Sequence, residues 1–399
     1  MKAGAVGLRA ARPGLTNLVP RTGRVLRSVL APWIVARVIV LGTLAVAHFV
    51  VDRIHPGTPG VTARVHQGLL GWDAGWYEAI ARFGYAPLGH QSLRFFPLFS
   101  LAGRALGFVT GLGDGDALVM LANASALVAT ALVFVLVRRE SGDEVLARRA
   151  VWLLSIVPPA FVLVMGYAEA TLLVFSVGCF LAIRRGAGRG HWTGRPGPAW
   201  CSAAALGFAA GLTRPLGVLL VVPVVVEAVR RRRSMTGREQ AAAALAAFAP
   251  LAGMAVFLGW SARVFGDALL PLRVQAQAGH HGGLSDPVAT LVHDARGLVH
   301  HHVGTALHLP WVLVVVALLV VCWRRWPASY GAFATAVVLV ALSGTNLDSF
   351  ERYSLSAFPL VLAGASLISR PTVERSVLVL AGAGLAVYAL LAFCNLLVP

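Results

Sequence analysis

The most chemically distinctive stretch of this sequence is residues 71–85, GWDAGWYEAIARFGY. It places a carboxylate, Asp73, between Trp72 and Trp76 in a chain with only 13% charged residues. A carboxylate within hydrogen-bond reach of a hydroxyl can act as its general base. The aromatic rings have two interpretations: an interfacial belt at the lipid headgroups, or a platform on which the apolar face of a sugar stacks. A belt needs no acid, so the stretch favours a chemical site.

The composition indicates that this site belongs to a membrane protein. Of the 399 residues 57% are hydrophobic, and the mean hydropathy is +0.75. Apolar runs recur that are long enough to cross a hydrocarbon core about 30 Å thick. The net charge of +17 does not indicate a nucleic-acid partner, because the arginines lie in short clusters between these runs. The four cysteines have neither zinc-site nor disulfide spacing. We therefore predict an all-α polytopic protein of the lipid bilayer.

The apolar runs predict a bundle of about eleven transmembrane helices, which forms one domain over residues 30–397 after a basic cytoplasmic arm, residues 1–29. The predicted spans are 30–51, 117–137, 149–165, 168–183, 198–212, 216–229, 241–262, 309–323, 328–343, 354–369 and 376–397. Residues 95–113 are apolar but carry Arg104, and a crossing there would place the later arginine clusters outside. We expect this segment to form an interfacial helix in the first outer loop.

This topology gathers the polar chemistry on the outer face. It creates two long outer loops, 52–116 and 263–308, with short outer turns between other spans. Charges at membrane depth are costly unless they are paired or face water, so their retention indicates function. The charged residues in or beside the outer segments are Asp73, Arg94, Glu169, Arg214, Asp267, Asp348, Glu351 and Arg352. Heavy use of Arg, Ala, Gly and Val suggests a GC-rich bacterial genome, which predicts the plasma (inner) membrane with an extracytoplasmic site.

The second outer loop is rich in histidine, with GHHGG at 279–283, His293 and HHH at 300–302. Clustered histidines can bind a divalent metal, but these occur in adjacent runs rather than at i, i+4 or with carboxylates at ligand spacing. We favour a polar loop that faces the acceptor, and we predict no cofactor.

Several motifs in collinear order carry a family resemblance. WDAGWYEAIARFGY is followed by RFFPLFSLAGRAL, VPPAFVLVMGYAEATLLVF, GLTRPLGVLLVVP, FGDALLPLRVQAQ and ERYSLSAFPL, from about residue 71 to 360. This series resembles the PIG-V-like mannosyltransferases of the GT-C superfamily. The resemblance implies a GT-C-type membrane glycosyltransferase. Such an enzyme transfers a sugar, usually mannose, from a polyprenyl-phosphate donor to a glycolipid or protein acceptor on the outer side, with inversion. It also implies that Asp73, the acid of the first outer loop, activates the acceptor hydroxyl.

The chemistry of the residues is compatible with this reaction. The leaving lipid phosphate gains negative charge, which a guanidinium fork stabilises. Arg214, Arg352 and Arg94 are the candidates for that role. Each arginine has an alternative role as an outer-leaflet headgroup anchor or as a helix-linking partner of Glu169 or Glu351.

Other residues are candidates for substrate binding. They are Trp72, Trp76, Tyr77, Tyr167, Glu169, Glu351 and Asp267. Glu169 could orient an acceptor hydroxyl or pair with Arg214, or it could simply be an acid favoured by the dipole at a helix N-terminus. Asp267 follows a glycine, a pair that most simply makes a turn.

The main alternative from another class is a transporter or flippase for a lipid-linked or anionic substrate. Transporters often contain inverted repeats, but the sequence has no second copy of WDAGWY, and its polar residues gather on one face. The sequence also has no Walker-type loop and no G-x-G-x-x-G turn opening a helix after a strand. This speaks against direct use of a nucleotide sugar and is compatible with a lipid-linked donor.

Overall fold

The computed structural model describes residues 22–54, 57–185, 196–277, 283, 285–292, 303–345 and 347–399. Within these ranges every regular element is a helix, and five helices are long and apolar enough to cross a membrane. They are α1 (Thr22–Phe49) with the π-helix η2 (Val50–Ile54), α5 (Asp114–Ser141), α10 (Gly237–Phe265), α13 (Val303–Arg325) and α17 (Pro371–Phe393). The predicted fold class, an all-α membrane protein, is confirmed.

The other predicted spans coincide with shorter helices, several of which are interrupted at prolines. The uninterrupted ones are α7 (Glu169–Ile183), α8 (Pro196–Thr213) and α14 (Ala328–Leu342). The interrupted ones are α6 (Glu144–Ile156) with η6 (Pro158–Leu163), η7 (Pro215–Leu220) with α9 (Val221–Arg231), and α15 (Phe350–Ser356) with α16 (Pro359–Ala365). Proline lacks a backbone donor and breaks the helical ladder. The number of helices that cross the membrane stays a prediction.

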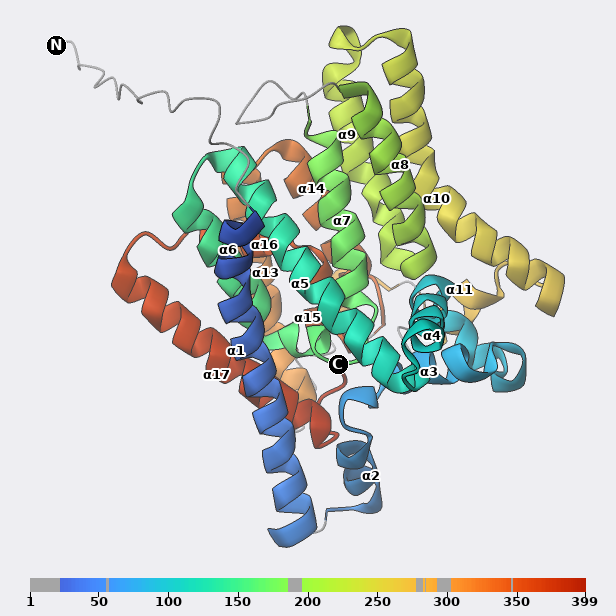
Figure 1. Cartoon of the computed structure of the whole chain (residues 1–399), viewed down its shortest axis with the longest axis vertical. Coiled ribbons are helices and arrows are strands. Elements are labelled where there is room, and N and C mark those ends of the chain that lie inside the picture. The colour runs from blue at the N-terminus through green and yellow to red at the C-terminus, as the bar shows by residue number, and fades with distance from the viewer. Residues whose placement is uncertain are drawn as a thin grey trace.

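The helices form two packed groups joined by α7 (Figure 1). In one group α1 packs on α17, α5 and α6; in the other, α10 packs on α8 and α9. Small residues allow α8 and α10 to approach closely, because a Cβ added at Gly211 would lie 2.1 Å from the Pro250 carbonyl oxygen, and one at Gly253 would lie 2.2 Å from that of Phe208. Helix α7 contacts both α5 and α8 and is buried along most of its length.

The first predicted outer loop is folded into short helices. They are α2 (Pro59–Gln67), η3 (Gly68–Leu70), α3 (Asp73–Phe83), η4 (Ala86–Leu88), η5 (His90–Arg94) and α4 (Pro97–Thr110). Helix α2 lies near the bottom of Figure 1, and α3 and α4 lie at its right. The segment predicted as interfacial is helical, and this helix, α4, packs against α3 and α5. Its position relative to a membrane stays a prediction, as do the sidedness of the loops and the division into an arm and a single domain. Residues 1–21 of the arm lie outside the described residues.

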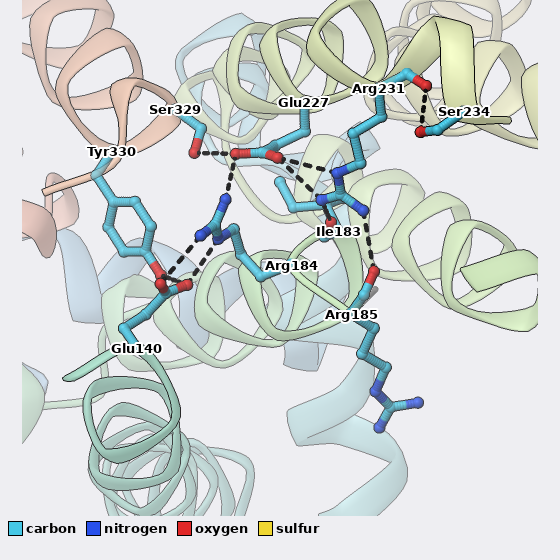
Figure 2. Close-up of polar contacts among 9 residues, drawn as sticks. All are labelled: Glu140, Ile183, Arg184, Arg185, Glu227, Arg231, Ser234, Ser329 and Tyr330. Carbon is cyan, nitrogen blue, oxygen red and sulfur yellow. Dashed lines mark hydrogen bonds and ion pairs between the residues drawn. The ribbon is translucent and has the colours of Figure 1, made fainter. Parts of the chain in front are cut away.

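Helix α7 has a charge cluster at each end. In the cluster at its C-terminal end, the charged side chains pair with one another (Figure 2). Arg184 donates to both Glu140 oxygens, at 2.6 and 3.0 Å, and to Glu227 at 2.8 Å. Glu227 also accepts from Arg231 at 2.9 Å and from the Ser329 hydroxyl at 2.7 Å. The Tyr330 hydroxyl donates to Glu140 at 3.0 Å. These six residues, here called the C-terminal network, tie α5, α7, α9 and α14 together.

Candidate active site

A cavity of about 220 Å³ lies at the other end of α7. It is formed by the start of α3, the turn before α7, the turn before η7, and α15, so segments far apart in the sequence meet there. Its lining residues are Trp72, Asp73, Tyr77, Arg94, Phe95, Tyr167, Arg214, Pro215, Leu216, Gln275, Val340, Asp348, Ser349, Arg352, Tyr353, Val398 and Pro399. The cavity therefore combines the carboxylates of Asp73 and Asp348 with three guanidinium groups and several aromatic rings.

Asp73 is the first residue of α3, where the positive end of the helix dipole favours a negative charge. Its side chain is 26% exposed, and its Oδ2 accepts from Arg352 Nη1 at 2.5 Å. Its backbone N–H donates to the Tyr167 hydroxyl at 3.3 Å. The residue before it, Trp72, has a φ of 59°, a left-handed backbone conformation that is uncommon outside glycine. The start of α3 is thus held by contacts from two distant segments.

The environment of Asp73 favours its ionised form. Burial raises the pKa of this carboxyl, but the guanidinium of Arg352, with smaller contributions from Arg94 and Arg214, outweighs burial and leaves the pKa below its usual range. A carboxylate with a lowered pKa is a weaker proton acceptor. Loosening of its contact with Arg352 would therefore make Asp73 a stronger base.

Glu169, at the start of α7, is the second carboxylate of the cluster. It is 1% exposed, pairs with Arg214, and lies 3.4 Å from Arg352 Nη1. Its Oε2 and the Nε of Arg352 are both buried without a hydrogen-bond partner among the described residues. An unsatisfied buried polar group costs about 1–3 kcal/mol. The cluster therefore retains one unused acceptor and one unused donor beside the cavity.

Aromatic rings that also line the cavity lie close to its guanidinium groups. Arg352 lies 5.4 Å from the Tyr167 ring centroid and 5.3 Å from that of Tyr353, and Arg214 lies 5.7 Å from the latter. Arg94 lies 4.9 Å from the Phe95 ring centroid. These cation–π contacts hold the cations in place without neutralising them. The three guanidinium groups can therefore contact an anionic ligand in the cavity.

The structure brings most of the predicted site residues together. Asp73, Arg94, Arg214, Arg352, Trp72, Tyr77 and Tyr167 line the cavity, and Glu169 pairs with two of its arginines. Tyr77 is buried, which raises the pKa of its phenol to about 12, so this hydroxyl remains protonated. Trp72 also anchors the loop, because its indole N–H donates to the Ala392 carbonyl of α17 at 2.9 Å.

Three predicted residues have other surroundings. The Trp76 ring stacks on Phe95 with centroids 5.9 Å apart, and Trp76 does not line the cavity. The buried Glu351 forms a hydrogen bond of 2.8 Å with His308 on α13. Asp267 pairs with the exposed Arg273 at 2.6 Å and accepts from the Leu269 backbone at 2.9 Å, as in a turn. The histidines of the loop 279–302 lie outside the described residues.

Sequence reasoning missed other residues of the cavity, of which Gln275, Ser349 and Tyr353 carry polar groups. The Ser349 hydroxyl accepts from Arg352 Nη2 at 3.2 Å, and its φ is 64°. No sequence pattern identifies this serine as a cavity residue. Its position three residues before Arg352 becomes informative only once Arg352 has been chosen as a site residue. Gln275 reaches the cavity from α11 (Leu270–Gln275), within the FGDALLPLRVQAQ motif.

Comparisons with known proteins give the chain no family. No family model and no curated protein matches it. Among solved structures, an oligosaccharyltransferase of Archaeoglobus fulgidus in complex with zinc and sulfate is 14% identical with a TM-score of 0.44, and covers 90% of this chain. The same organism's AglB, in complex with an inhibitory peptide and a dolichol-phosphate, is 14% identical over 89% of this chain, with a TM-score of 0.41.

The chain spans 52% and 55% of the length of these two structures. Similarity at this level assigns neither a family nor an activity, so any function has to rest on the residues of this chain. The PIG-V-like resemblance stays a prediction.

Proposed function

We propose that this protein is a membrane glycosyltransferase that moves a sugar from a lipid-phosphate donor to an acceptor hydroxyl. The observation that carries this proposal is the placement of Asp73 and three arginines around one cavity. In the reaction the acceptor oxygen bonds to the anomeric carbon while the bond from that carbon to the phosphate oxygen breaks. The hydroxyl proton passes to the Asp73 carboxylate, and the lipid phosphate leaves with the bonding electrons.

The arginines serve the leaving group. Arg214, Arg352 and Arg94 all face the cavity, and charge-assisted bonds from guanidinium groups to phosphate are among the stronger hydrogen bonds in proteins. Arg352 has an additional donor, Nε, that no other group in the described residues engages. Negative charge that develops on the phosphate strengthens these contacts in the transition state, which lowers the barrier.

Donor binding also activates the base in this scheme. Arg352 is paired with Asp73 at 2.5 Å and depresses the pKa of that carboxyl. A phosphate that draws the Arg352 guanidinium toward itself weakens this pair, so the proton affinity of Asp73 rises when the donor is in place. The acceptor hydroxyl is then activated only beside a bound donor, which limits transfer to water.

An apolar groove beside the site suits the lipid chain of such a donor. It has a volume of about 300 Å³ and lies among α6, α13, α15, α16 and α17. Helix α15 borders both spaces, because Arg352 and Tyr353 line the cavity whereas Ser354 and Leu355 line the groove. A phosphate at the arginines can therefore extend its chain along apolar side chains such as Trp311 and Leu318.

The finer assignment follows the motif resemblance. We propose mannose as the sugar, a polyprenyl phosphate as its carrier, and a glycolipid or protein hydroxyl as the acceptor, with inversion at the anomeric carbon. The site faces outward across a bacterial inner membrane in this proposal. Cysteines introduced singly at positions 75 and 187 test the orientation, because a membrane-impermeant thiol reagent should label the first from outside and the second only from inside.

The decisive experiment is transfer of radiolabelled mannose from polyprenyl-phosphate-mannose into extracted lipids and proteins. Purified wild type should give a labelled product, and Asp73→Asn should give at least about 100-fold less. Asp267→Asn is the matched control, because this carboxylate also pairs with an arginine but lies in a turn that does not line the cavity. Absence of product with any lipid-linked sugar, together with substrate uptake in proteoliposomes, would favour the transporter alternative.

A further inference from the structure

A second cluster of side chains lies where α1 ends. His48 and Asp52 are four residues apart at the junction of α1 and η2, and His66 is on α2. Asp52 Oδ1 is 3.0 Å from His66 Nε2, and Asp52 Oδ2 is 3.6 Å from His48 Nδ1. The two imidazole rings stack with centroids 5.3 Å apart. None of the three residues lines the cavity of the candidate active site.

We propose that His48, Asp52 and His66 form a binding site for a divalent transition metal, with Zn²⁺ as the best-suited ion. One ligand atom from each residue lies within 4.8 Å of the other two. Ligand atoms about 2.0–2.1 Å from Zn²⁺ in tetrahedral geometry lie roughly 3.3 Å apart. The two Asp52 distances, 3.0 and 3.6 Å, are near this value but end on different carboxylate oxygens, so side-chain rotations have to bring one oxygen and both histidine nitrogens around a single metal position.

The donor set selects the class of ion. Two imidazole nitrogens and one carboxylate are ligands for zinc and other late first-row metals, whereas Mg²⁺ and Ca²⁺ require mostly oxygen. The three side chains are half-exposed, which leaves a position for water as a fourth ligand. A dication also suits the stacked rings better than protonation does, because two imidazolium ions at this separation would repel each other.

The π-helix places the aspartate for this role. Residues Val50–Ile54 form a π-helical turn at the end of α1, and Asp52 lies within it. Single π-helical turns are rare and are frequently found at functional sites. Helix α2 then returns beside the end of α1, which brings His66 to Asp52 across fourteen residues of sequence.

A metal at this position would fix the segment that leads to Asp73. Helix α2 continues through η3 to the start of α3, and Arg64 of α2 lies 4.1 Å from the Trp72 ring centroid. In η3, the Leu69 carbonyl accepts from the Gly166 backbone at 3.0 Å, one residue before Tyr167. The metal would thus be a structural tether between α1 and the loop that carries Asp73. This site does not depend on the proposed transferase activity.

Co²⁺ binding to the full chain in detergent tests the proposal. The protein is purified without a histidine tag and stripped with a chelator, and Co²⁺ is added as a spectroscopic substitute for Zn²⁺. Wild type should show the intense visible bands of low-coordinate Co²⁺, and Zn²⁺ should displace them. Asp52→Asn and His66→Ala should each weaken binding at this site by at least about 100-fold, because even the loss of an outer hydrogen-bond partner costs 10–100-fold.

Two controls separate this site from other histidines. His90→Ala removes an exposed histidine outside the cluster and should leave the bands unchanged. Replacing the histidines at 280, 281, 293 and 300–302 by glutamine should also leave them unchanged. If the bands persist in the Asp52→Asn/His66→Ala double variant, or vanish with the loop histidines, the proposal is wrong. Thermal unfolding gives a second measurement, because Zn²⁺ should raise the Tm of wild type but not that of the double variant.

Discussion

The two charge clusters at the ends of α7 are both largely buried, but they differ in whether all their hydrogen-bonding atoms have partners. In the C-terminal network Arg184 and Arg231 oppose Glu140 and Glu227, so the formal charges cancel, and two hydroxyls supply further hydrogen bonds (Figure 2). In the cluster at Asp73, by contrast, an oxygen of Glu169 and a nitrogen of Arg352 are buried without a hydrogen-bond partner among the described residues. Only the latter cluster lines the 220 Å³ cavity.

The difference shows that burial of charge alone does not identify a functional site. A saturated network in a low-dielectric interior holds helices in one arrangement, and it offers a ligand nothing. A network with open hydrogen-bond positions is costly to maintain and gains from a ligand that completes it. We therefore propose a structural role for the C-terminal network and a ligand-binding role for the cluster at Asp73.

The largest expected effect is on activity at Asp73. Asp73→Asn removes the proposed base while preserving the shape of the side chain, and sugar transfer should fall by about 10²–10⁴-fold, the usual contribution of general base catalysis. The measurement is kcat/KM with a polyprenyl-phosphate sugar, with size-exclusion chromatography to check folding. Glu227→Gln, in the C-terminal network, should leave kcat/KM of the folded fraction near wild type. Equal losses in both variants would contradict the division into a structural and a functional cluster.

The next effect is on stability and lies at the other end of α7. Arg184→Ala leaves Glu140 and Glu227 buried without their shared partner, and loss of one member of a buried ion pair costs about 3–5 kcal/mol. The free energy of unfolding in detergent micelles measures this change. Arg148→Ala is the matched control, because its pair with Glu144 is an exposed i, i+4 contact on α6 and should cost less than about 1 kcal/mol. A loss at Arg184 as small as at Arg148 would mean that the network does not stabilise the bundle.

A third prediction concerns use of the donor. Arg352→Gln removes a guanidinium from the cavity, and kcat/KM for the lipid-phosphate donor should fall by about 10²–10³-fold, as for loss of one donor to a developing anion. The KM for the acceptor should change little, because Arg352 acts on the phosphate. Arg273→Gln, at an exposed pair with Asp267, is the control. An unchanged kcat and donor KM in Arg352→Gln would remove Arg352 from the site.

Part of the lining of this cavity could be predicted from the sequence, for a physical reason. Charges in or beside apolar segments are costly unless they are paired or face water, which singled out Asp73, Arg94, Arg214 and Arg352, and all four line one cavity. Apolar runs likewise predicted where helices lie, although prolines interrupt three of the predicted spans. Each of these signals is local in the sequence.

Which charged side chains pair with one another could not be predicted, because the partners lie far apart in the sequence. Arg352 meets Asp73 across 279 positions, whereas its neighbour Glu351 points to His308 on α13. Arg184 belongs to a cluster of basic residues that predicts only a cytoplasmic loop, yet its side chain is buried between two acids. Its role depends on α9 and α14, whose positions next to α7 follow from packing and leave no local pattern in the sequence.

The smallest expected effect is on the pH dependence of transfer. Because the pKa of Asp73 lies below its usual range, this carboxylate stays ionised at mildly acidic pH. The stabilisation from its ion pair is present above the unfolded-state pKa of about 3.9 and is lost as the pH falls through the lower folded-state value. In wild type, protonation of Asp73 should therefore lower kcat/KM by less than about 2-fold between pH 7 and pH 5.

Arg352→Gln sharpens this test, because it removes the largest charge that depresses the pKa of Asp73. Its residual activity should fall at a higher pH than that of wild type, which a pH profile of kcat/KM from about pH 4 to 8 would show. Asp73→Asn should abolish this acid limb in either background. An acid limb at the same pH with and without Arg352 would mean that another group limits the reaction. In that case the Asp73–Arg352 pair would resemble the C-terminal network, a contact that holds helices and does not tune a base.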